Sequence, residues 1–137
     1  MIIYLDIDGV LLTTRNTKAV FNAELFINFL VNSFDCYWLT THCKGDTKPT
    51  IRYLEQFFDS EIVELLKRIK ATNWNTLKTE AIDFNSDFYW LEDNPFKSEI
   101  KVLEEYGLED RLLTVDLNRN DEYDNLMSFL KNKNGKK

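Results

Sequence analysis

The chain is poor in the residues that crosslink small secreted proteins or bind structural metals. It has 137 residues, of which two are cysteine and one is histidine. Cys36 lies within an apolar run, and Cys36 and Cys43 form no Cys-x-x-Cys pair, so the sequence indicates neither a disulfide framework nor a zinc site. We therefore expect reduced thiols and a cytoplasmic location.

Long apolar runs are also missing. No run approaches the ~18 residues of a membrane span, and the chain enters an apolar strand directly, without the pattern of a signal peptide. There is no Gly-x-x-x-x-Gly-Lys-Ser/Thr loop, which argues against a P-loop kinase. The net charge of −6 disfavours broad, non-specific adhesion to nucleic acid. We expect no membrane partner, and nothing in the sequence indicates an oligomeric state.

Apolar and aromatic residues, in contrast, are plentiful. The chain is 44% hydrophobic and has ten phenylalanines, six tyrosines and three tryptophans. This is enough for one well-filled core, while the length is too short for two domains. We predict one domain over residues 1–131 and a flexible tail over residues 132–137.

The opening stretch, residues 2–11, is an apolar run that leads into two carboxylates and a glycine. Its apolar part is continuous, as in a strand that is buried on both faces of a parallel sheet. Asp6 and Asp8 follow at the carboxyl end of this strand. Residues two apart in a strand point to the same side, so both carboxylates can reach one crevice. Their repulsion calls for a cation, and Mg²⁺ suits oxygen ligands.

A second apolar run, residues 87–95, ends in the same way. Glu92 and Asp93 come at its end and are followed by Asn94 and Pro95. Because adjacent residues of a strand point to opposite faces, we expect only one of the two carboxylates to face the crevice.

Three other polar groups come at strand ends or helix starts. The run of residues 35–41 reads as a strand that closes with Thr40 and Thr41, and His42 follows directly. A lone histidine of this kind is predicted to be an ordinary loop residue. Lys78 falls in the first turn of a helix that we expect to begin at Thr76, where a cation is disfavoured by the helix dipole.

Periodic apolar residues and turn signals predict the remaining elements. We expect helices over residues 19–34, with Pro49 in a first turn, from Ser60 as N-cap, from Thr76, over a segment that includes residues 100–106 and stops at Gly107, and around 123–130, and a further strand over residues 111–116. Strands that alternate with helices indicate an α/β fold with a mostly parallel central sheet.

These motifs, in this order, resemble those of the haloacid dehalogenase-like (HAD) hydrolases over about residues 1–116. Asp6-Ile7-Asp8-Gly9-Val10-Leu11 is similar to the family's first motif, Thr40 to the second, Lys78 to the third and Glu92-Asp93-Asn94 to the fourth. Thr41 and Lys70 are the less favoured choices for the second and third motifs. The resemblance implies a three-layer, Rossmann-like fold, and the short insertion segments imply a member with no large cap domain.

The resemblance also implies roles for these residues. Asp6 would attack phosphorus, Asp8 would act as acid and base, and Lys78 would hold the nucleophile and the phosphate. Thr40 and backbone N–H groups near Gly9 and Thr41 would bind the phosphoryl oxygens. Mg²⁺ would be held by Asp6, Asp93 and the backbone carbonyl of Asp8, with Glu92 as the second choice for the acidic ligand.

The function that follows is a Mg²⁺-dependent phosphatase acting through an aspartyl-phosphate. Asp8 favours phosphatase over dehalogenase chemistry, because members that attack carbon lack this second aspartate. Two alternatives stay open: a phosphatase-like binding or regulatory module, and a phosphatase domain of nucleic-acid end repair that works with a partner.

Basic residues flank the expected site. They are Arg15, Lys18, Lys44, Lys48 and Arg52. Such a rim would attract a polyanion. We therefore expect a phosphorylated substrate that is large or polyanionic, such as an oligonucleotide end or a phosphoprotein.

Overall fold

The centre of the fold is a four-stranded sheet in which all strands are parallel. The computed structural model describes residues 1–134. The strands are β1 (Ile2–Leu5), β2 (Asp35–Trp38), β3 (Phe88–Glu92) and β4 (Leu112–Thr114), and their order in the sheet is β2-β1-β3-β4. In register, Leu5 of β1 lies beside Trp38 of β2 and Leu91 of β3. The predicted α/β architecture with a parallel sheet is confirmed.

Both faces of the sheet are buried, as the continuous apolar run of β1 predicts. Ile3 and Leu5 point into one hydrophobic cluster, whereas Tyr4, between them, belongs to a second cluster on the opposite face. Trp38 and Trp90 are fully buried in these two clusters, one on each face. Alternation along a strand thus supplies two cores at once.

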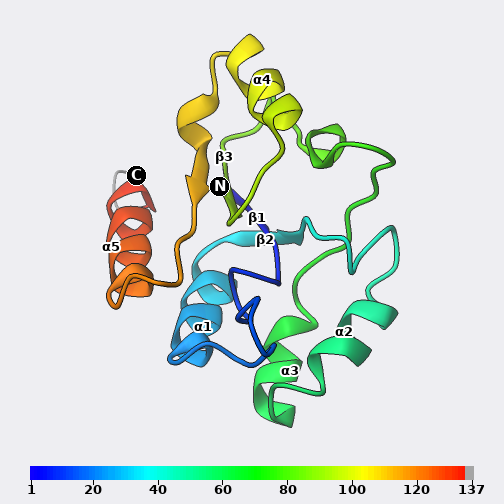
Figure 1. Cartoon of the computed structure of the whole chain (residues 1–137), viewed down its shortest axis with the longest axis vertical. Coiled ribbons are helices and arrows are strands. Elements are labelled where there is room, and N and C mark those ends of the chain that lie inside the picture. Colours follow the sequence, from blue (N-terminus) through cyan, green and yellow to red (C-terminus); the bar gives the residue numbers. More distant parts are fainter. Residues whose placement is uncertain (135–137) are drawn as a thin grey trace.

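Helices cover the two faces (Figure 1). The helical segments are α1 (Ala23–Ser33), α2 (Lys48–Leu54), α3 (Ser60–Leu66), the 3₁₀ helix η1 (Lys78–Ala81), α4 (Lys97–Glu105), the 3₁₀ helix η2 (Glu109–Arg111) and α5 (Glu122–Asn134). Side chains of α1, α3 and α5 pack in the cluster that holds Ile3, and those of α4 and residue Ile82, just after η1, pack in the other. The result is a helix–sheet–helix sandwich.

The order of the strands places a crevice between β1 and β3. From β1 the chain passes through α1 to β2, which lies next to β1 at one edge of the sheet. From β3 it passes through α4 to β4 at the other edge, and α4 packs on the opposite face of the sheet from α1. Connections that diverge in this way leave the carboxyl ends of the two central strands uncovered, and such switch points are where open α/β sheets bind ligands. The acidic residues that follow β1 and β3 lie at this point.

A tight turn and a small hairpin follow β1. The backbone N–H groups of Val10, Leu11 and Leu12 all donate to the carbonyl of Ile7, and Leu12 then pairs with Ala19 in an antiparallel bridge. Between β1 and β3, the described chain forms this hairpin, α1, β2, the short helices α2 and α3, and η1.

Several predicted boundaries were wrong, for local reasons. Helix α1 begins at Ala23 instead of residue 19, because Ala19 is held in the hairpin and Asn22 adopts a left-handed conformation with φ 65°. The N-cap of α3 is Asp59, whose carboxylate accepts from the N–H of Ile62, and not Ser60. The helix expected from Thr76 is only the four-residue η1.

The end of the chain also differs from the prediction. Helix α5 continues to Asn134, so residues 132–134 are helical where a tail was expected. Residues 135–137 of that expected tail lie outside the described residues. Over residues 1–134, no helix has both the length and the apolar character needed to cross a membrane.

Candidate functional site

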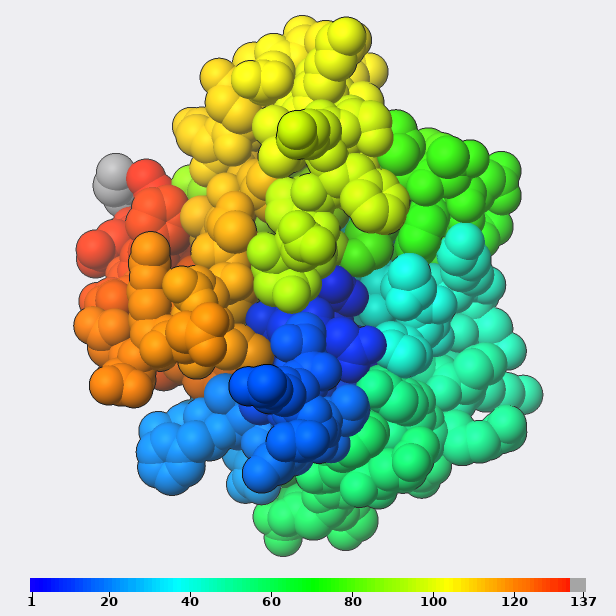
Figure 2. Space-filling view, in the orientation of Figure 1, coloured from blue at the N-terminus to red at the C-terminus, as the bar shows by residue number. Residues whose placement is uncertain are grey.

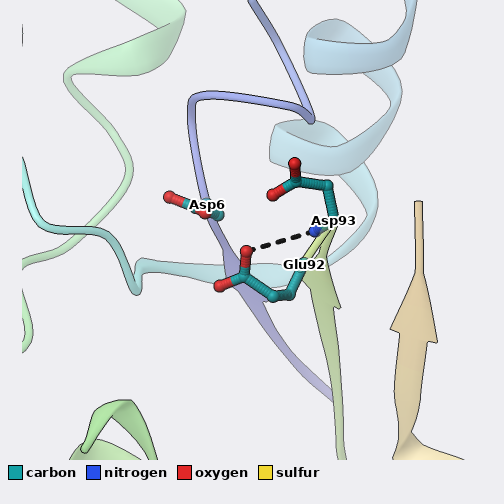
Figure 3. Close-up of side chains that lie close together, drawn as sticks. All are labelled: Asp6, Glu92 and Asp93. Atoms are coloured by element: carbon teal, nitrogen blue, oxygen red, sulfur yellow. Dashed lines mark hydrogen bonds between the residues drawn. The ribbon is translucent and has the colours of Figure 1, made fainter. Parts of the chain in front are cut away.

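Three carboxylates converge at the carboxyl ends of β1 and β3 (Figure 3). Asp6, Glu92 and Asp93 each offer an oxygen, and these oxygens lie within 4.8 Å of one another. The expectation that only one of Glu92 and Asp93 faces the crevice was wrong. Strand β3 ends at Glu92, so the side chains of Glu92 and Asp93 need not point to opposite faces of the sheet. The N–H of Asp93 donates to Glu92 Oε2 at 3.2 Å.

Lys78 neutralises part of this charge. Its Nζ lies 3.2 Å from Asp6 Oδ2 and 2.6 Å from Glu92 Oε1. Burial lowers the pKa of Lys78, but the neighbouring carboxylates outweigh burial and raise it, so the ammonium stays charged. Lys70, the alternative considered for this role, instead pairs with Asp35 at the start of β2, at the far end of the sheet.

The backbone of Lys78 is held by a residue that the sequence interpretation missed. Glu99 of α4 is 3% exposed, and its carboxylate accepts from the N–H of Lys78 at 2.8 Å and from the N–H of Phe96 at 2.9 Å. Glu80 accepts from the N–H of Leu77 at 2.9 Å just before it. The predicted helix from Thr76 is only the short η1, so these hydrogen bonds fix the backbone at Lys78 in its place.

The pKa of Glu92 departs strongly from its ordinary value. Burial, followed by the nearby charge of Asp6, raises its pKa to about 9, although Lys78 opposes this. Without a metal ion, Glu92 therefore holds a proton at neutral pH, whereas a cation among the three carboxylates would displace that proton.

A pH-dependent stability follows for the metal-free protein. The raised pKa means that the folded state keeps the Glu92 proton above pH 4.5 while the unfolded chain loses it, so this stabilisation is complete below pH 4.5 and lost as the pH rises toward 9. In EDTA, the free energy of unfolding of the wild type should fall relative to Glu92→Gln by up to about 1.4 kcal/mol per pH unit over this range. Urea titrations at several pH values would measure the difference, and a constant difference would contradict the assignment.

The donor set fits a hard divalent cation. All three groups are carboxylates, which are the ligands that Mg²⁺ and Ca²⁺ prefer. The backbone leaves room for them at Gly9, which has φ +81°. A Cβ placed on Gly9 would lie 2.2 Å from Cγ of Asp93, so only glycine allows Asp93 to occupy this position.

Gly9→Ala should therefore damage the metal site specifically. The added methyl must displace the Asp93 carboxylate, and we expect Mg²⁺ affinity to fall by about tenfold or more, measured by calorimetric titration. Gly107→Ala is the matched control, because Gly107 also has a positive φ but a Cβ there meets nothing within 4 Å. Both variants should lose about 1–2 kcal/mol from backbone strain, and equal affinity in both would show that Asp93 is not a ligand.

Asp8 lies outside the cluster of three and has its own partners. His42 Nε2 lies 2.7 Å from Asp8 Oδ2, and the hydroxyl of Tyr53 donates to Asp8 Oδ1 at 3.1 Å. His42 lies in the loop after β2, as expected, but its contact with Asp8 was not predicted, and Tyr53 was missed. A polar residue directly after a strand end was the signal available for His42.

The hydroxyl residues after β2 differ in their surroundings. Thr40 is fully buried next to the site, and its Oγ1 accepts from the N–H of His42 at 3.3 Å. Thr41 is exposed. Strand β2 pairs with β1 so that Trp38 lies beside Leu5, and the N–H of Leu39 donates to the carbonyl of Leu5. Continued by one residue, this register places Leu39 beside Asp6, and Thr40 follows one residue further along.

A cleft of about 550 Å³ opens beside the acidic cluster. Its wall includes Gly9 and Asp93, hairpin residues 13–15, and residues 114–118 after β4. Figure 2 shows these segments meeting near the centre of one face, where blue, yellow-green and orange atoms adjoin. Of the basic residues expected at the rim, Arg15 lines this cleft, whereas the ammonium of Lys44 lies 3.9 Å from the ring centroid of Trp74.

Comparison of the chain with protein-family models, with curated proteins and with solved structures gives no match.

Proposed function

We propose that the protein is a Mg²⁺-dependent phosphatase that acts through an aspartyl-phosphate on Asp6, as its resemblance to the HAD hydrolases implies. One observation carries the proposal: the Asp6 carboxylate pairs with Lys78 and lies close to two further carboxylates at a switch point of the sheet. Asp8, two residues later, is kept apart from that cluster. A nucleophile beside a cation site and a separate acid is what phosphoryl transfer needs.

In the first step, an oxygen of Asp6 attacks phosphorus in line. A bond forms between this oxygen and phosphorus while the bond from phosphorus to the leaving oxygen breaks, and Asp8 gives its proton to that oxygen. In the second step, Asp8 takes a proton from water, which attacks the phosphorus of the aspartyl-phosphate. Inorganic phosphate leaves, and Asp6 is regenerated as a carboxylate.

The remaining groups balance charge. When bound by Asp6, Asp93 and Glu92, with the backbone carbonyl of Asp8, Mg²⁺ supplies positive charge to the phosphoryl oxygens. Lys78 contributes a second positive charge and orients Asp6 Oδ2 at 3.2 Å. The hydroxyl of Thr40 and backbone N–H groups near Gly9 and Thr41 are the proposed donors to the other phosphoryl oxygens.

For the substrate, we favour a phosphate on a large or polyanionic molecule, such as an oligonucleotide end or a phosphoprotein. The cleft opens to the surface beside Asp93, and Arg15 contributes a positive charge to its wall. Lys18, Lys48 and Arg52 add positive charge in the flanking segments of an otherwise acidic chain. Such charge raises the rate of encounter with a polyanion.

The direct test is a hydrolysis screen with Mg²⁺ and with EDTA. Phosphorylated metabolites, phosphopeptides and oligonucleotides with 3′- or 5′-phosphates would be compared by release of inorganic phosphate. We expect turnover that needs Mg²⁺ in at least one class. Binding of the phosphorylated ligand without turnover would contradict the phosphatase and favour a binding module.

The proposed polyanion preference has its own salt dependence. Raising salt from low to physiological should lower kcat/KM more for a phosphorylated oligonucleotide or phosphopeptide than for a small aryl phosphate, because screening weakens the long-range attraction. Arg15→Gln should reduce that difference. Lys101→Gln, an exposed change on α4 away from the cleft, should leave it unaltered. The same salt dependence for both substrates would refute the preference without affecting the phosphatase assignment.

A further inference from the structure

We infer that His42 and Tyr53 form a clamp that positions Asp8 for its acid–base role and keeps its side chain out of the metal cluster. The inference rests on the proposed function, since it assigns Asp8 a task in phosphoryl transfer. His42 and Tyr53 are positioning residues: they act on the reaction through Asp8.

The two residues of the clamp contact the two carboxylate oxygens of Asp8, and each comes from a different part of the chain. His42, after β2, lies 2.7 Å from Oδ2, and Tyr53, on α2, donates to Oδ1 at 3.1 Å. The two rings stack with centroids 4.0 Å apart and planes only 12° from parallel. With two partners at fixed positions, rotation of the Asp8 side chain breaks both bonds.

The clamp is itself braced. The N–H of His42 donates to Oγ1 of Thr40, and the carbonyl of His42 accepts from Oγ1 of Thr50 at 2.7 Å. Tyr53 also contacts Phe57 edge-on, with ring centroids 5.3 Å apart. The imidazole and the phenol are thus oriented by the loop after β2 and by α2, independently of the acidic cluster.

The need for such a clamp follows from the charges nearby. Asp8 lies two residues from Asp6, and a cation held by Asp6, Glu92 and Asp93 would attract any mobile carboxylate. A carboxylate bound to the metal cannot donate a proton to the leaving oxygen. Fixing Asp8 elsewhere preserves its role.

The two partners suit a group that gains and loses a proton in each cycle. Burial, and then the hydrogen bond to Asp8, raise the pKa of Tyr53 to about 12, so its hydroxyl remains a donor. A neutral imidazole with its proton on Nε2 donates to Asp8 Oδ2 whether or not Asp8 is protonated, because a carboxylic acid keeps lone pairs that accept. The contact with His42 therefore persists in both halves of the reaction and leaves the proton of Asp8 free for the leaving oxygen.

The experiment separates the two chemical steps. Tyr53→Phe removes only the hydroxyl, and His42→Phe keeps a ring to stack on Tyr53 but removes its nitrogen. Rapid-quench kinetics with an activated aryl phosphate and with an alkyl phosphate would be measured in Mg²⁺. Tyr106→Phe, an exposed change just after α4, is the matched control.

We expect the phosphorylation burst with the activated aryl ester to change by less than about threefold, because a good leaving group needs no proton. Phosphorylation by the alkyl ester, and steady-state kcat with both, should fall by about 10- to 100-fold, within the usual range for acid–base catalysis. KM and Mg²⁺ affinity should stay near the wild-type values. His42→Gln, which keeps an amide donor and acceptor, should recover part of the loss.

The decisive comparison is made in the Asp8→Asn background. If the clamp acts through Asp8, Tyr53→Phe and His42→Phe should cause little further loss there, a non-additivity typical of residues that act as a unit. A full further loss, or wild-type rates in the single variants, would overturn the clamp while the phosphatase assignment stood. A wild type without any Mg²⁺-dependent phosphatase activity would overturn both.

Discussion

Asp6→Asn should abolish Mg²⁺-dependent phosphatase activity, with kcat reduced by at least about a thousandfold. The neutral amide is a much weaker nucleophile than the carboxylate, and it replaces one oxygen of the cluster of three carboxylates by nitrogen. Steady-state release of phosphate from the best substrate of the screen would measure the loss. Acid-quenched protein should carry no phosphoryl group.

The fold should survive this change. The amide oxygen of the new asparagine can still accept from the N–H of Ile7, which bonds to Asp6 Oδ1 at 2.8 Å in the wild type. Removing one charge also relieves repulsion within the cluster, and Lys78 keeps its contact with Glu92. Circular dichroism and urea unfolding near wild-type values would therefore distinguish lost chemistry from lost structure. Full activity in a folded Asp6→Asn protein would exclude Asp6 as the nucleophile.

The features that sequence predicts best here are those set by neighbours along the chain. Asp6 and Asp8 follow an apolar run whose burial on both faces requires a central strand, and Ile3 and Tyr4 do point to opposite clusters. Parallel strands bring their carboxyl ends to one edge, so Asp6 and Asp93 were expected to meet there. Local pattern and sheet geometry are sufficient for this part.

The arrangement at the end of β3 depends on where the strand stops, which sequence patterns leave uncertain by a few residues. Alternation would separate Glu92 from Asp93, but the last strand residue is Glu92 itself. The turn that follows returns Asp93 to the cluster, next to Gly9. An error of one residue in a strand end is enough to change the number of carboxylates in the site.

Residues that act across long stretches of sequence were the ones missed. Tyr53 reaches Asp8 from α2, and Glu99 reaches the backbone of Lys78 from α4. The spacing of residues within one helix or strand cannot predict either contact, because both contacts depend on how the helices pack against the sheet. A buried glutamate such as Glu99 is recognisable only once its two N–H partners are in place.

Holding Lys78 and Asp8 by separate supports divides the site into two parts. On one side, the partly buried ammonium of Lys78 contacts the carboxylates of Asp6 and Glu92, and Glu99 accepts from the backbone N–H of Lys78. Asp8, His42 and Tyr53 form a hydrogen-bonded group on the other. Asp6 and Asp8, although two residues apart, thereby acquire different surroundings, which is how two similar carboxylates take different roles.

Asp8→Asn tests that division, because it should stop one step and spare another. Asparagine cannot supply a proton to the leaving oxygen or take one from water, but Asp8 lies outside the cluster of three carboxylates, so Mg²⁺ affinity should hold. With an activated aryl phosphate the variant should still form the aspartyl-phosphate, while its hydrolysis slows by about 10²- to 10⁴-fold. The phosphoenzyme should then accumulate to nearly one per protein.

Acid quench after reaction with a radiolabelled activated ester would measure this accumulation, with Asp6→Asn as the control that accepts no label. The fold should be retained, since the hydroxyl of Tyr53 can still donate to the amide oxygen in place of Asp8 Oδ1. Phosphoenzyme that decays as fast in Asp8→Asn as in the wild type would mean that another group activates the water. If neither protein can be labelled while both release phosphate, Asp6 is not the nucleophile and water attacks the substrate directly.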